Sequence, residues 1–279
     1  MSTFNVLLLD GIDPAGVQLL EQTGSIVPIV HDKITREKLL ALVPEVDGII
    51  VRSATVVDKE LIQKAPRLRV VGRAGVGVDN VDIDAATEHG VLVMNSPGGS
   101  TTTTAEHAIA MLFALARSIP QAYLSLKNGK WDKSRFKGTE ITGKTLGVVG
   151  LGRIGSEVAR KCQGMGMNVL AYDPFINPDT PLSSGLVLAG IDEIWEKADF
   201  ITFHVPLTDE TRNLVNRETI ARMKDGVRLV NCARGGIIHE EDLLAALKTG
   251  KVAGAALDVF ETEPNPNTPL LKEENFIAT

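Results

Sequence analysis

The stretch that decides the fold is Thr145–Gly155, which reads TLGVVGLGRIG. Its largely apolar first half enters a turn with the pattern G-x-G-x-x-G. Apolar side chains at helical spacing follow the turn, and a second apolar run, residues 168–172, ends at Asp173, which lies 18 residues beyond Gly155. A strand, a glycine turn, a helix, a second strand and an acid in this order are the fingerprint of a dinucleotide-binding βαβ unit.

Each part of this fingerprint has a physical role. Gly150 permits a tight turn, Gly152 lets the backbone approach a pyrophosphate, and Gly155 lets the helix pack closely on the strand. We expect the pyrophosphate at the helix N-terminus, where free N–H groups and the helix dipole favour an anion. Asp173 would accept hydrogen bonds from the adenosine ribose hydroxyls and would repel a 2′-phosphate, so the sequence predicts NAD rather than NADP.

Bulk properties narrow the class of protein. The chain has 279 residues, which favours two domains over one. Its net charge of −6, from 29 basic and 35 acidic residues, argues against nucleic-acid binding. No apolar stretch is long enough to span a bilayer and no secretory signal is visible, so we expect a cytoplasmic protein without a membrane partner. Cys162 and Cys232 give neither a disulfide framework nor metal-ligand spacing, and no metal is expected.

The alternation of strand and helix patterns defines the expected domains. Residues 1–98 are predicted to form a flavodoxin-like, substrate-binding domain, and residues 99–279 a Rossmann NAD-binding domain that includes a long helix from about residue 101. Both would be doubly wound α/β domains with parallel sheets. The expected strands are 6–9, 26–30, 48–51, 69–72, 91–94, 145–149, 168–172, 200–203, 227–230 and 252–257, and helices are expected over 15–22, 36–43, 59–64, 83–89, 122–128, 192–197, 217–223 and 240–248.

The segment between the two sheets leaves two interpretations open. His107 lies in the long buried helix and is more typical of a packed helix residue than of a catalyst. The polar stretch 130–140 contains Trp131 in a loop that is expected to be exposed. Such an arm often contacts a partner subunit, although a loop folded on its own domain fits the sequence nearly as well.

Two arginines and a glycine loop mark a candidate anion site in the first domain. Arg52 and Arg73 follow neighbouring strands, and Gly75 and Val76 lie in the loop that Arg73 opens. Guanidinium groups grip carboxylates and phosphates bidentately, and glycines expose backbone N–H groups to an anion. The alternative is that each arginine caps a strand end or pairs with an acid.

Polar residues also follow the strands of the second domain. They are the segments 204–206, 231–236 and 258–264, each at a strand end on the side where the nucleotide should lie. A histidine, an arginine and several acids at these places could bind and polarise a 2-hydroxy or 2-keto acid. Cys232 as a nucleophile is disfavoured, because no histidine is paired with it in the sequence.

Taken together, the whole chain resembles the D-isomer-specific 2-hydroxyacid dehydrogenases. The resemblance rests on the segments 51–55, 72–80, 231–236 and 258–264, and on the spacing of 29 residues between Arg234 and Glu263. It is strongest to the subgroup that oxidises 3-phospho-D-glycerate to 3-phosphohydroxypyruvate with NAD, the first step of serine biosynthesis. A hydroxypyruvate or glyoxylate reductase, another D-2-hydroxyacid dehydrogenase, and a non-catalytic NAD-sensing protein of the same fold are the alternatives.

The resemblance implies a division of labour among the residues. Arg234 would bind the substrate carboxylate and polarise the carbonyl, and Glu263 would hydrogen-bond a catalytic histidine. Val76 and Val205 stand where some relatives carry threonine, which leaves backbone contacts intact. Substrate would be held by Arg52, Arg73, Gly75 and Val76, and NAD would be contacted by Gly150, Gly152, Arg153, Ile154, Gly155, Asp173, His204, Val205, Pro206, Cys232, Ala233, Arg234, Asp258 and Val76.

The family's catalytic histidine is expected in a Pro-His-x-Gly segment after a strand that resembles Asn275–Thr279. The sequence ends at Thr279, so we expect a C-terminally truncated piece of a longer enzyme that binds NAD but turns over slowly. His204, at a strand end, is the one plausible substitute among the five histidines and is disfavoured. By family habit, the protein would be a homodimer or homotetramer.

Overall fold

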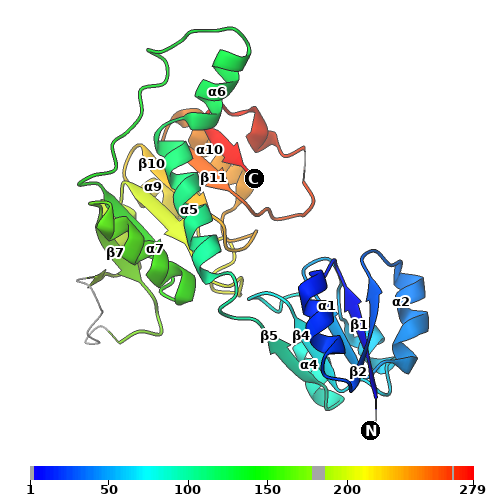
Figure 1. Ribbon diagram of the computed structural model, residues 1–279. Coiled ribbons are helices and arrows are strands. Elements are labelled where there is room, and N and C mark those ends of the chain that lie inside the picture. Colours follow the sequence, from blue (N-terminus) through cyan, green and yellow to red (C-terminus); the bar gives the residue numbers. More distant parts are fainter. Residues whose placement is uncertain (1–2, 178–185, 266) are drawn as a thin grey trace. The chain divides into compact units, whose positions relative to one another are not determined.

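The computed structural model describes residues 3–177, 186–265 and 267–279. The chain divides into two compact units, residues 1–100 (unit 1) and residues 101–279 (unit 2), each with its own parallel sheet (Figure 1). The predicted pair of α/β domains is therefore confirmed at the level of fold.

Unit 1 has a five-stranded sheet in the order β2-β1-β3-β4-β5 with all neighbours parallel. This is the strand order of flavodoxin-like folds, in which polar residues at the carboxyl ends of β1, β3 and β4 lie along one edge. In chain order the elements are β1 (Phe4–Leu9), α1 (Pro14–Glu21), β2 (Ile26–His31), α2 (Arg36–Leu42), η1 (Val43–Glu45), β3 (Gly48–Val51), α3 (Lys59–Gln63), β4 (Val70–Arg73), α4 (Ile83–Glu88) and β5 (Leu92–Asn95).

Short polar side chains fix where the helices of unit 1 begin. The N-cap residues Asp13, Thr35, Asp58 and Asp82 each accept a hydrogen bond from a backbone N–H of the first helical turn. Helices α2, α3 and α4 then bury aliphatic side chains against the sheet. The helices thus start at defined residues, and this defines the lengths of the loops that carry the candidate anion-binding residues.

Unit 2 has a seven-stranded parallel sheet in the order β12-β11-β10-β9-β6-β7-β8. Relative to β6 as the first strand, this is the Rossmann order, with one further strand at an edge. In chain order the elements are α5 (Thr101–Ala116), α6 (Ile119–Lys127), β6 (Thr145–Val149), α7 (Arg153–Gly164), β7 (Asn168–Tyr172), β8 (Val187–Leu188), α8 (Ile191–Lys197), β9 (Phe200–Phe203), α9 (Arg217–Arg222), β10 (Val227–Asn231), α10 (Glu240–Thr249), β11 (Val252–Leu257), η3 (Pro269–Lys272) and β12 (Phe276–Ala278).

Both faces of the sheet of unit 2 are covered by helices. On one face, α5 and α7 pack over the middle of the sheet, and on the other α8, α9 and α10 form a second core (Figure 1). The strands β9 and β10 consequently carry mostly apolar side chains, and beside the half-buried Arg228 their polar residues Thr202 and Asn231 are buried, at 1% exposure each. Both residues take part in the candidate site.

The structure differs from the sequence-based prediction at a few element boundaries. α6 begins at Ile119 rather than at 122, because Pro120 fits the first helical turn instead of preventing it. Strand β8 was not predicted, because two residues are too short for an alternating apolar pattern to be recognised in the sequence. The loop after α6 follows the prediction, and Trp131 is 80% exposed.

Within the described ranges, no single helix is long and apolar enough to cross a membrane. The pair α5 and α6 reaches that length and composition only when taken together, with a bend of 60° between them.

Candidate active site

The glycine turn after β6 has the geometry that the sequence predicted, with one refinement. Gly150 has φ +95°, a conformation that side chains rarely adopt. A Cβ on Gly155 would lie 1.9 Å from the carbonyl oxygen of Gly150. Gly155 is therefore needed because the helix packs closely against the glycine turn, and not only against the strand. A Cβ on Gly152 would meet nothing within 4 Å. The space beside Gly152 is thus open to a ligand.

Helix α7 begins directly at this turn and presents its N-terminus to it. Its N-cap is Gly152, and no side chain of the described residues caps it. The first turn carries no acidic residue. The N–H groups at Arg153 and Ile154, together with the helix dipole, therefore form a place for an anionic group.

Asp173 lies at the end of β7, beside the same turn. Its carboxylate accepts hydrogen bonds from the N–H of Leu151 at 2.9 Å and from the N–H of Phe175 at 2.9 Å. These two bonds fix the carboxylate next to the glycine turn. Each carboxylate oxygen keeps a second lone pair that can accept a hydroxyl. The open space at Gly152, the uncapped helix and this acid together fit NAD.

His204, at the end of β9, is packed against the turn. A Cβ on Gly150 would lie 2.7 Å from the carbonyl oxygen of His204, and the ring nitrogen Nε2 of His204 lies 3.0 Å from Oγ1 of Thr202. Burial lowers the pKa of His204 to about 4. The ring is therefore neutral near pH 7 and a poor proton donor, which agrees with its being disfavoured as the catalytic acid.

Asn231 organises the loop that carries Arg234. The Asn231 amide donates to the carbonyl of Arg234 at 2.9 Å and its oxygen accepts from the N–H of Ala233 at 3.0 Å. A Cβ on Gly235 would lie 1.7 Å from the carbonyl oxygen of Phe260, so this loop touches the next one. Sequence reasoning quoted Asn231 as part of a motif but missed this positioning role.

The second loop carries Glu263. Its carboxylate accepts a hydrogen bond from the N–H of Phe260 at 2.9 Å. Glu261 and Glu240 exchange backbone-to-carboxylate bonds at 2.9 and 2.7 Å, which ties the loop to the start of α10. The structure thus places Arg234 and Glu263 on adjoining loops, both at the carboxyl ends of the strands.

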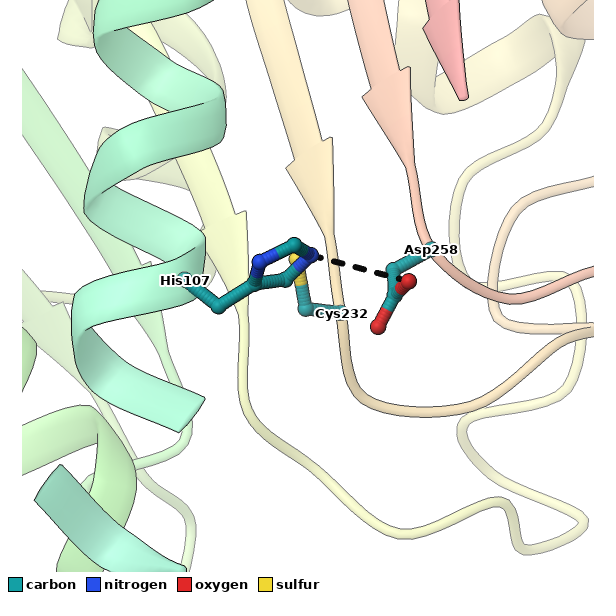
Figure 2. A group of neighbouring side chains, drawn as sticks. All are labelled: His107, Cys232 and Asp258. Carbon is teal, nitrogen blue, oxygen red and sulfur yellow. Dashed lines mark ion pairs between the residues drawn. The ribbon is translucent and has the colours of Figure 1, made fainter. Parts of the chain in front are cut away.

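A group of side chains gathers at the same sheet edge from three elements. His107 of α5, Cys232 after β10 and Asp258 after β11 point toward one another (Figure 2), and Nε2 of His107 lies 3.6 Å from Oδ1 of Asp258. Thr279 Oγ1 donates to the same carboxylate oxygen at 2.7 Å. Burial and the neighbouring Asp258 raise the pKa of the Cys232 thiol to about 12, so it is no nucleophile near pH 7.

This group shows that His107 is only partly packed, and it leaves Cys232 disfavoured as a nucleophile for a different reason than the sequence suggested. His107 is not simply a packed helix residue, because its side chain is 39% exposed and faces Asp258. Cys232 does have a histidine nearby, although the two lie 125 positions apart in the sequence. The sequence could not indicate the pairing, since a helix and two strand ends meet only in the folded sheet.

In unit 1, Arg73 is the last residue of β4, and Arg52 directly follows the neighbouring strand β3. Val51 lies opposite Arg73 in the register of β3 and β4. Arg52 is the next residue after Val51, so the two arginines lie at neighbouring strand ends. The guanidinium of Arg73 lies over Gly75, where a Cβ would come within 1.3 Å of it. Val76 is held through its carbonyl by the Asn95 amide at 2.6 Å.

Two residues that sequence reasoning missed shape the Arg52 loop. Asp10, directly after β1, accepts hydrogen bonds from the N–H groups of Arg52 at 2.9 Å and Thr55 at 3.0 Å. Asn80 donates to the carbonyls of the same two residues at 2.8 and 2.6 Å. The signal that could have indicated Asp10 is an acid directly after a buried strand, followed by a glycine.

This fold and these strand-end residues define a dinucleotide-binding protein of the Rossmann type. Residues 109–279 match the family model described as D-isomer specific 2-hydroxyacid dehydrogenase, NAD binding domain. The chain belongs to this family, as its resemblance predicted, and NAD is its cofactor.

Three relatives illustrate the similarity. The D-3-phosphoglycerate dehydrogenase of Archaeoglobus fulgidus is 50% identical over 275 residues, which is 98% of this chain and 52% of the relative. A glyoxylate reductase structure from Paecilomyes thermophila has a TM-score of 0.90 at 30% identity and covers 100% of this chain and 88% of its own. The NAD-dependent formate dehydrogenase from Staphylococcus aureus, in complex with NAD, has a TM-score of 0.87 at 30% identity, with 99% and 87% covered.

The chain spans about half the length of the curated relatives it matches.

Proposed function

We propose that the protein oxidises 3-phospho-D-glycerate to 3-phosphohydroxypyruvate with NAD, the first step of L-serine biosynthesis. The observation that carries this proposal is 50% identity to a D-3-phosphoglycerate dehydrogenase over 98% of the chain. The strand-end arginines Arg52, Arg73 and Arg234 suit a substrate with both a carboxylate and a phosphate.

In the proposed site, unit 2 would bind the cofactor and also carry Arg234 and Glu263, the residues proposed to act in catalysis. The N–H groups of Arg153 and Ile154 would hold the pyrophosphate, and Asp173 would accept hydrogen bonds from the ribose hydroxyls. Residues 204–206, residues 231–234 and Asp258 would contact the nicotinamide end of the cofactor. When bound, NAD would be the acceptor of the hydride that leaves C2 of the substrate.

The chain's own residues bind and polarise the substrate. The guanidinium of Arg234 binds the carboxylate and stabilises the negative charge that develops on the C2 oxygen. Arg52, Arg73 and the N–H groups at Gly75 and Val76 bind the remaining anionic group. Glu263 would orient the histidine that, by the family resemblance, takes the proton of the 2-hydroxyl.

A second candidate is reduction of glyoxylate or hydroxypyruvate, favoured by the 30% identity to a glyoxylate reductase structure. The two functions differ in the need for a phosphate-binding group. Steady-state assays of the protein with 3-phospho-D-glycerate, D-glycerate, D-lactate and glycolate distinguish them. We expect the highest kcat/KM with the phosphorylated acid, and a clear preference for an unphosphorylated acid would contradict the proposal.

We also propose that the protein works as a homodimer or homotetramer in the cytoplasm. α6 and the loop after it expose Tyr123, Leu124, Leu126 and Trp131, each more than 50% exposed. Apolar side chains gathered in this way are typical of interaction surfaces. Light scattering after size exclusion measures the mass, and a monomer at micromolar concentration would contradict the dimer.

A further inference from the structure

We propose that His107, Cys232 and Asp258 form a binding site for a zinc ion. The ring nitrogen, the sulfur and a carboxylate oxygen of these three residues all lie within 4.8 Å of one another (Figure 2). Nitrogen, sulfur and oxygen are the ligand atoms that zinc takes in proteins.

The separations suit tetrahedral coordination. With usual zinc–ligand lengths, ligand atoms in a tetrahedron lie about 3.3–3.5 Å apart. Nε2 of His107 and Oδ1 of Asp258 are already 3.6 Å apart. Both side chains are about two-fifths exposed, at 39% and 38%, so they can close by small rotations toward the sulfur. The backbone of the sheet edge need not move.

A neighbouring hydroxyl, that of Thr279, contacts two of the proposed ligands. Thr279 Oγ1 donates to Asp258 Oδ1 at 2.7 Å and lies 3.1 Å from His107 Nε2. Zinc would replace Thr279 at Nε2 of His107, whereas the hydroxyl could still donate to Asp258, whose carboxylate has further lone pairs. Three protein ligands leave the fourth tetrahedral position for water or a ligand.

The choice of metal follows from the thiol. Cys232 is a buried free cysteine, and a hard cation such as Mg²⁺ does not displace a thiol proton. Zinc binds the thiolate strongly enough to do so, with release of the proton. Without a metal, an exposed His–Asp pair of this kind contributes little to stability.

A consequence links this site to the cofactor. Cys232 and Asp258 are also assigned to NAD binding under the proposed function, and this consequence rests on that assignment. Zinc and NAD would then exclude one another, which would make zinc an inhibitor competitive with the cofactor.

The direct test is a metal titration of the 279-residue chain. Calorimetry with Zn²⁺ should give one equivalent, Co²⁺ should give a thiolate-to-cobalt absorption band, and Mg²⁺ should give no binding. Cys232→Ser should abolish the band, whereas Cys162→Ser, at the other buried cysteine, should retain it. His107→Asn should lower zinc affinity at least about 10-fold, and His31→Asn in unit 1 should leave it unchanged.

The outcomes separate the site from the cofactor claim. A band that persists in Cys232→Ser, or zinc affinity unchanged in His107→Asn, overturns the metal site. If Cys232→Ser fails to fold by circular dichroism, the half-exposed His107 variant decides. In a second arm, zinc should raise the apparent Kd for NAD in the parent chain but not in His107→Asn. NAD that fails to bind without zinc would contradict the proposed function alone, whereas NAD and zinc binding together would refute their competition.

Discussion

The two glycine-containing loops that follow β6 and β4 differ in what fixes them. In unit 2, Gly150 and Gly155 are pressed against backbone atoms, and the turn leads directly into α7. In unit 1, the closest neighbour of Gly75 is the side chain of Arg73, and the next helix, α4, begins only at Ile83. The first loop has one shape because rigid backbone surrounds it, whereas the second is shaped by a side chain that can move.

This difference matches the ligand that each loop is proposed to bind. A pyrophosphate at a helix end needs N–H groups held in place before binding. A small acid bound by arginines tolerates adjustment, because a guanidinium sits on a flexible stem. The comparison can be tested from the most to the least disruptive change.

The largest effect is expected for Gly155→Ala. The added methyl would lie 1.9 Å from the Gly150 carbonyl oxygen, and backbone on both sides must shift. We expect a loss of more than about 3 kcal/mol of unfolding free energy, since overpacking against backbone lies at the high end of such effects, together with loss of NAD binding. Gly164 ends the same helix, and a Cβ there would meet nothing within 4 Å. Gly164→Ala should therefore leave the free energy of unfolding unchanged or raise it. Urea unfolding and NAD calorimetry measure both, and equal behaviour of the two variants would contradict the argument.

A pH effect should follow from His204, which packs against the turn. Its pKa falls from 6.5 to about 4 on folding because burial disfavours the charged ring. Between these values the unfolded chain binds the proton more strongly, so stability falls as the pH drops from about 6.5 toward 4, by up to about 3 kcal/mol. His204→Asn should remove this part of the pH dependence, and His31→Asn should keep it. Identical pH profiles of unfolding for parent and His204→Asn would rule the effect out.

Asp173 tests whether the fixed turn is also selective for its cofactor. Asp173→Ala removes the carboxylate that is expected to bind the ribose, and NAD affinity should fall about 10- to 100-fold, the size expected for hydrogen bonds to a charged group. Asp173→Asn keeps one acceptor oxygen without the charge, so it should bind NAD better than Asp173→Ala and discriminate less against NADP. Calorimetry with both cofactors gives the answer, and unchanged NAD affinity in Asp173→Ala would disprove the ribose contact.

The smallest stability effect is expected in the loop of unit 1. Gly75→Ala displaces the Arg73 guanidinium, a flexible group, and should cost no more than about 1 kcal/mol. If Arg73 binds substrate, KM should nevertheless rise, while kcat changes less. Gly98→Ala, with open space in the same unit, should alter neither. If Gly75→Ala lost as much unfolding free energy as Gly155→Ala, the proposed difference between the two loops would be wrong.

Much of the fold and of the cofactor site could be predicted from local patterns. The Thr145–Gly155 stretch and Asp173 are close in sequence, so the turn, helix and acid were recognisable without the sheet. The strand-end positions of Arg52, Arg73 and Arg234 followed from counting elements. The expected start of α6 at residue 122 was too late, because Pro120 fits the first turn of the helix.

By itself, the sequence determined the α/β class and the dinucleotide fingerprint, because these depend on periodicity and on spacing along the chain, and its resemblance to a known family indicated the family. Only the tertiary structure decided that Asn231 holds the Arg234 loop, that Asp10 holds the Arg52 loop and that His107 meets Cys232 and Asp258. The physical reason is that a parallel sheet brings strand ends together from distant parts of the chain. Contacts along that edge leave no trace in local sequence.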